Sequence, residues 1–118
     1  MSGTDRPLEP HMMRLVNRAA REARAILGPS DGLAQTLLKR YLAEVPERMS
    51  EYARSWNETR TETAFGISLP TWELAAERLQ ASYVALVLTE RVRAAEIAIA
   101  REETDARRAL PGAWEVTL

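Results

Sequence analysis

Cysteine is absent from the 118-residue chain, and histidine occurs once, at His11. The lack of cysteine excludes a disulfide framework and thiolate metal sites. A single histidine cannot complete the usual zinc ligand sets without cysteine, and the Glu-x-x-His motif of di-iron helical bundles is missing. We therefore expect no metal and no other cofactor, and we interpret His11 as an ordinary surface residue.

Catalytic motifs are lacking as well. The sequence contains no glycine-rich phosphate loop, no Ser-x-x-Lys and no His-Glu-x-x-His. Carboxylates at helical spacing do occur, as in Glu73 with Glu77, but such pairs usually face solvent, whereas acid–base catalysis needs one of them in an apolar pocket. An enzyme with an unrecognised carboxylate site stays an alternative that no motif favours. We expect a protein that is not an enzyme.

Long apolar runs are also missing. The longest extends from Tyr83 to Leu88, whereas a membrane-spanning helix needs about 20 apolar residues. The first ten residues lack the apolar core of a secretion signal. The net charge of −1 gives no general attraction to nucleic acids or membranes. These features predict a soluble, cytoplasmic protein that forms one domain over residues 1–118.

Apolar residues recur at steps of three and four along most of the chain, which predicts helices. After a loose lead-in over residues 1–7, a first helix should extend to Leu27 and end at Gly28-Pro29. A second helix should follow an N-cap at Ser30 or Asp31. Pro46 then ends it, kinks it or begins another helix, and residues 57–70 read as a connection.

The longest stretch without glycine or proline runs over residues 71–110, and we expect one long helix there with Thr71 as its N-cap. A break near Thr89 is an alternative, because the length far exceeds that of typical helices. From Ala81 to Leu88 the stretch is apolar on nearly all sides. Its middle should therefore be surrounded by other helices or by a partner chain.

Residues 111–118 alternate apolar and polar side chains, as an extended tail does. This tail either folds back on its own helices or docks on a neighbouring subunit, since tryptophan is a favoured interface anchor. The candidate partner-interface residues are therefore on the long helix and in the tail: Tyr83, Leu86, Leu88, Trp114, Val116 and Leu118.

Lysine is nearly absent, since 15 of the 16 basic residues are arginines. On a helical wheel, four arginines of the first helix share the side opposite its apolar stripe, and two basic residues of the second helix extend the pattern. The candidate phosphate-contacting residues are Arg14, Arg18, Arg21, Arg24, Lys39 and Arg40. Residues 1–40 have a charge balance of +3 and residues 41–77 one of −4. The stripe therefore pairs either with acidic protein surface or with nucleic-acid phosphates.

Together these patterns predict an all-α fold, in which three or four helices pack around the long C-terminal helix. In size and helical style the chain is similar to the small helical subunits of large assemblies, such as the small subunits of CRISPR effector complexes and the scaffold proteins of phage particles. The expected function is that of a non-catalytic subunit that packs against protein chains, within a ribonucleoprotein if the arginines contact nucleic acid.

Overall fold

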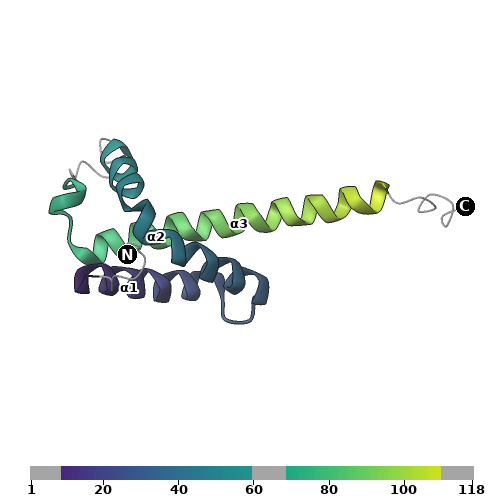
Figure 1. Cartoon of the computed structure of the whole chain (residues 1–118), viewed down its shortest axis with the longest axis horizontal. Coiled ribbons are helices and arrows are strands. Elements are labelled where there is room, and N and C mark those ends of the chain that lie inside the picture. The colour runs from purple at the N-terminus through teal and green to yellow at the C-terminus, as the bar shows by residue number, and fades with distance from the viewer. Residues whose placement is uncertain (1–8, 60–68, 110–118) are drawn as a thin grey trace, which may run out of the picture.

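The computed structural model describes residues 9–59 and 69–109, and this part of the chain is all-α, as predicted (Figure 1). It contains helices α1 (Pro10–Leu27), α2 (Gly32–Thr59) and α3 (Glu77–Ala109), with a short 3₁₀ helix, η2 (Trp72–Leu74), before α3. No strand occurs within these two ranges. The tail predicted over residues 111–118, with Trp114, Val116 and Leu118, lies outside the described residues.

Helix α1 follows its sequence pattern closely. Pro10 begins it, at a position where the missing N–H is not needed. Leu15, Ala19 and Ala23 have no exposed surface and form its buried stripe. Gly28 ends the helix with φ of 89°, in the left-handed region that favours glycine, and its N–H donates to the carbonyl of Arg24.

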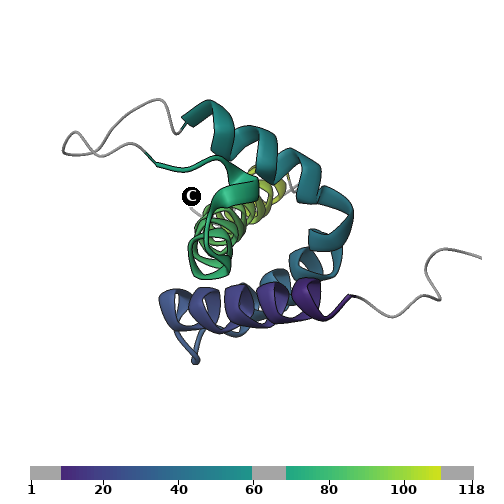
Figure 2. The ribbon, with the colours of Figure 1, turned by 90° about the vertical axis from the view of Figure 1, so that its left-hand side faces the viewer.

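Helix α2 continues through Pro46, so the proline does not end the helix or begin a new one. The helix bends along its length, and its two parts lie against different elements (Figures 1 and 2). A proline inside a helix removes one backbone hydrogen bond and crowds the preceding turn, which accounts for such a bend. At the start of α2, the Asp31 carboxylate accepts a hydrogen bond of 3.0 Å from the Ala34 N–H, as an N-cap does.

Helix α3 begins at Glu77, so the predicted start at Thr71 is wrong, and the Thr71 side chain makes no capping hydrogen bond. The reason lies in tertiary contacts of Trp72. Its backbone N–H donates to Asn57 Oδ1 (2.9 Å), and its backbone carbonyl accepts from Gln80 Nε2 (2.6 Å). These bonds hold the chain between η2 and α3 in a non-helical conformation, although no glycine or proline interrupts it.

An aromatic cluster fills the space between the C-terminal end of α2 and the N-terminal end of α3. Trp56, Trp72 and Tyr83 pack edge to face, with ring centroids 5.3–6.2 Å apart. Trp56 Nε1 also donates to the carbonyl of Pro70 (2.8 Å). The cluster closes one end of the core.

From Glu77 onward α3 is unbroken, and no break occurs at Thr89. Its buried stripe packs between α1 and α2 (Figure 2), with Val84, Leu88 and Val92 fully buried. The other helices of this chain do not surround the middle of α3, because Leu86 is 54% exposed. One side of α3 is therefore open within this chain. Its cover by a partner chain stays a prediction.

The C-terminal part of α3 extends well past α1 and α2 (Figure 1). Every residue over 100–109, named here the projecting segment, is exposed. The radius of gyration is 19.1 Å, whereas a compact domain of this length has one of about 13 Å. No helix of the described part is long and apolar enough to cross a membrane.

Candidate interaction surfaces

The arginines predicted on one side of α1 do share a face in the structure. This arginine face comprises Arg14, Arg18, Arg21 and Arg24. The first three line a shallow depression of about 340 Å³ together with Asn17 and Glu77. The predicted continuation is not part of it: Lys39 and Arg40 are exposed on α2 but do not line the depression.

One carboxylate, that of Glu77, lies at this depression. Its Oε2 is 3.3 Å from Arg14 Nε and 3.1 Å from His11 Nδ1. Sequence reasoning missed this acid, because Glu77 is 63 residues from Arg14 and only the packing of α3 on α1 brings them together. Arg18 and Arg21 form no ion pair with any residue of the ranges 9–59 and 69–109. Pairing with acidic protein surface therefore accounts for Arg14, and the two neighbouring guanidinium groups stay available.

A second surface follows the open side of α3. Leu79, Leu86 and Ile97 point to this side, since their separations of seven and eleven residues are close to two and three helical turns. We name this line of exposed residues the outer seam of α3. It consists of Leu79, Leu86, Glu90, Arg93, Ile97, Arg101, Thr104 and Arg108.

Beside the outer seam, α1 and α3 enclose an apolar depression of about 370 Å³. Ile26 of α1 (51% exposed) and Leu86 of α3 (54% exposed) lie at it, with Ala25 and Ser82. Glu22 also lines it: its Oε1 accepts a hydrogen bond of 3.1 Å from Ser82 Oγ. Its Oε2 is buried and has no hydrogen-bond partner among the described residues. The depression thus offers apolar surface and one unsatisfied carboxylate oxygen.

The three interface residues predicted on α3 differ in how far they are exposed to solvent. Leu88 is fully buried in the core of this chain. Tyr83 is half-buried in the aromatic cluster, where its hydroxyl hydrogen-bonds with Ser55 Oγ. Leu86 alone of the three presents more than half of its side chain to solvent. Sequence periodicity could not separate Leu86 from Leu88, because both fall in a segment that is apolar almost all round.

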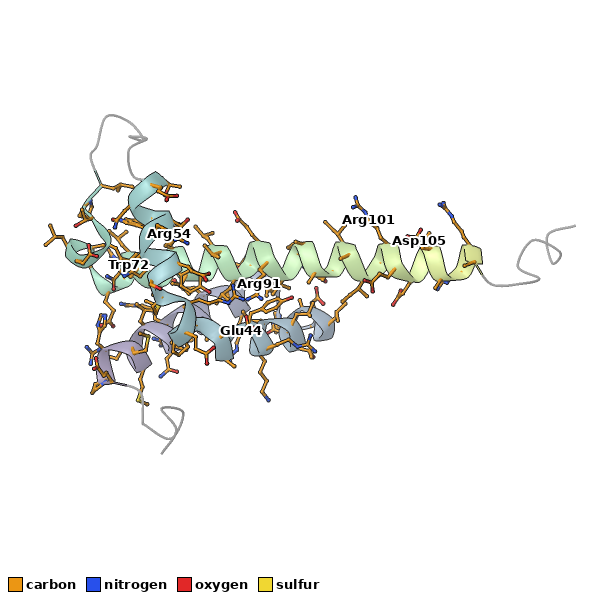
Figure 3. The ribbon with its side chains drawn as sticks, turned by 45° about the horizontal axis from the view of Figure 1, so that its top comes forward. Glu44, Arg54, Trp72, Arg91, Arg101 and Asp105 are labelled. Carbon is orange, nitrogen blue, oxygen red and sulfur yellow. The ribbon has the colours of Figure 1, made fainter. Side chains whose placement is uncertain are left out.

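Ion pairs join α3 to Glu44 in the first half of α2 and to Asp31 in the turn before α2. The Arg91 guanidinium binds the Glu44 carboxylate (Figure 3). It also lies 3.9 Å above the centre of the Tyr41 ring. The hydrogen bond from Arg91 lowers the pKa of Glu44 below its ordinary value. The Ala34 N–H, assisted by Arg93, lowers the pKa of Asp31 in the same way. Both acids therefore hold α3 in place, and their contacts outweigh the desolvation that would raise their pKa.

Within the described ranges, no group of three or more histidine, aspartate or glutamate side chains is arranged to hold a metal ion. No protein-family model matches the chain, and neither a curated protein nor a solved structure is similar enough to it to count as a match. The functional proposal therefore rests on the surfaces of the structure. They define a small all-α protein with one long projecting helix, an exposed seam of apolar and charged residues and a cluster of arginines.

Proposed function

We propose that this protein is a non-catalytic, cytoplasmic subunit that acts by packing against other protein chains in a multi-subunit assembly. The observation that carries the proposal is the outer seam, which stays exposed along α3 and continues onto the projecting segment. A helix with no packing partner is marginally stable in water, because tertiary burial supplies most helical stability in proteins. A partner that covers the seam would supply that burial.

The apolar content of the seam supports the proposal. Leu86 and Ile97 each expose more than half of a large side chain, and Ile26 of α1 adds a third next to Leu86. Single exposed apolar residues are ordinary, but residues aligned along one helix face and joined by an apolar depression are typical of an interaction surface.

The size of the native particle tests this function. A tagged chain from source-cell lysate should elute well above its own mass of 13.3 kDa. Ile97→Glu should return it to the size of the free chain, since it replaces an apolar contact by a carboxylate that a packed partner would bury without a counter-charge. Ala98→Glu is the matched control, because Ala98 is exposed one residue further on but lies on a different side of α3. Elution of the unmodified chain at its free size would contradict the proposal.

A second candidate function is contact with nucleic-acid backbone, which would make the assembly a ribonucleoprotein. It is favoured by the depression shared by Arg14, Arg18 and Arg21, in which two guanidinium groups have no described ion-pair partner. Arginine suits phosphate because its fork of N–H donors binds two oxygens at once.

Binding of a labelled single-stranded RNA or DNA oligomer at low and high salt tests this candidate. The affinity should fall as salt rises, because phosphate contacts release counterions. The double variant Arg18→Glu/Arg21→Glu should abolish binding without changing the native size. Arg54→Glu, a charge reversal on exposed surface of α2, should leave binding intact. Absence of binding at low salt would exclude nucleic-acid contact by the isolated chain.

A further inference from the structure

We infer that the outer seam of α3 packs against the same seam of a second copy of this chain, with the two helices antiparallel. The inference rests on the proposed function and names the partner. It arises from the spacing of the seam residues, from the charges among them and from the apolar depression beside them.

The seam has the spacing of a two-helix coiled coil. Leu86, Glu90, Arg93 and Ile97 follow one another at steps of four, three and four, and Thr104 continues the seven-residue period from Ile97. All five are exposed or partly exposed on the open side of α3. A seven-residue period lets two helices stay in contact over many turns.

One antiparallel register pairs six of the eight seam residues with one another, namely that in which the numbers of facing residues add up to 183. Leu86 then faces Ile97 of the second copy, and Glu90 faces Arg93 of the second copy. Leu79 faces Thr104. Because the pairing is two-fold symmetric, each of these contacts occurs twice. Arg93 uses Nη1 for Glu96 and Asp31 within its own chain, and its guanidinium keeps further N–H groups for the second copy.

Other pairings of the same two helices are worse. In a parallel pair Glu90 would face Glu90 and Arg93 would face Arg93, and facing like charges are destabilising. Sliding the antiparallel pair by seven residues in one direction places Leu86 opposite Glu90. Sliding it in the other direction places Ile97 opposite Arg93. In the first case Ile97 would face Leu79, but the contact between Glu90 and Arg93 would be lost. In the second case neither an apolar pair of the seam nor that charge pair would remain, so the register of 183 is the one of the three that keeps both kinds of contact.

The apolar depression beside the seam fits the same register. Leu86 lies at this depression together with Ile26 of α1. Ile97 of the second copy, which faces Leu86, would cover the exposed parts of both side chains.

Sedimentation of the purified chain over a range of concentrations gives the first test. The unmodified chain should form dimers. Ile97→Glu should raise the dimer dissociation constant about tenfold or more, while Ala98→Glu should not. Glu90→Arg should also weaken the dimer, because it places a like charge opposite Arg93 of the second copy. Both variants lie on exposed surface, so folding can be checked by circular dichroism.

Distances between spin labels give the second test. Because the chain lacks cysteine, Asp105→Cys provides one labelling site on the projecting segment (Figure 3). The register of 183 separates the two labelled positions by 27 residues along the helix axis, or about 40 Å. A parallel pair would bring them to about 10 Å, the distance between packed helices.

A dimer with the long label distance, lost in Ile97→Glu, is the expected result. A monomer at all concentrations, or a dimer with the short distance, would overturn the inference. Neither of these results bears on the proposed function by itself. A purified monomer whose native particle in the lysate is still large and Ile97-dependent would mean a different protein partner, whereas a native particle of single-chain size would contradict both.

Discussion

Replacing Leu88 by alanine tests the division of α3 into a buried and an open side. Leu88 is fully buried between α1 and α2, whereas Leu86, two residues earlier on the same helix, is 54% exposed. Both are leucines of one unbroken helix, so helix propensity changes equally when either becomes alanine. Any difference in stability therefore reports burial.

The magnitudes follow from that burial. Leu88→Ala removes a fully buried side chain and leaves a cavity, which costs about 3 kcal/mol. For a chain of this length, such a loss lowers the melting temperature by about 12 °C. Leu86→Ala removes a side chain of which about half is in contact with the protein, so it should cost less than about 1 kcal/mol.

Urea unfolding at low protein concentration measures both changes without a contribution from assembly. Tryptophan fluorescence follows the transition, because Trp56 and Trp72 lie in the aromatic cluster of the core. The midpoint should move strongly for Leu88→Ala and little for Leu86→Ala, with similar dependence on urea concentration. Equal losses of stability in the two variants would refute the assignment of the open side.

Two further predictions concern residues that precede α2 and α3. Asp31→Ala should lower the urea midpoint at pH 7, and the difference from the unmodified chain should shrink as the pH falls below the ordinary pKa of 3.8. The sign follows from the lowered pKa of Asp31: its stabilisation is present above the unfolded value and is lost as the pH falls through the folded one. Trp72→Ala should destabilise the fold by about 3–5 kcal/mol, measured by urea unfolding, because it removes one of the three rings of the aromatic cluster and leaves a cavity.

Helical periodicity was sufficient to predict α1 and most of α2. The buried stripe of α1 repeats at steps of four, as in Leu15, Ala19 and Ala23, and Gly28 marks its end. The start of α3 could not be predicted in this way. The hydrogen bonds of Trp72 to Asn57 and Gln80 join residues eight to fifteen positions apart, and these contacts override a local sequence that favours helix.

The candidate surfaces were predictable only in part. A helical wheel places Arg14, Arg18 and Arg21 on one side of α1, and the structure brings them to one depression. The wheel carries no information about Glu77, which reaches that depression from another helix. It also could not reveal that Leu86 faces solvent, since that depends on where α1 and α2 leave α3 uncovered.

Hydrogen exchange along α3 tests most directly whether its projecting segment is a packing surface. The tagged chain isolated from source cells is compared with the Ile97→Glu variant. Amides over residues 100–109 should exchange slowly in the assembled protein, as in a covered helix, and rapidly in the variant. Amides around Leu88 should be protected in both. Equally rapid exchange over residues 100–109 in the two proteins would contradict the account.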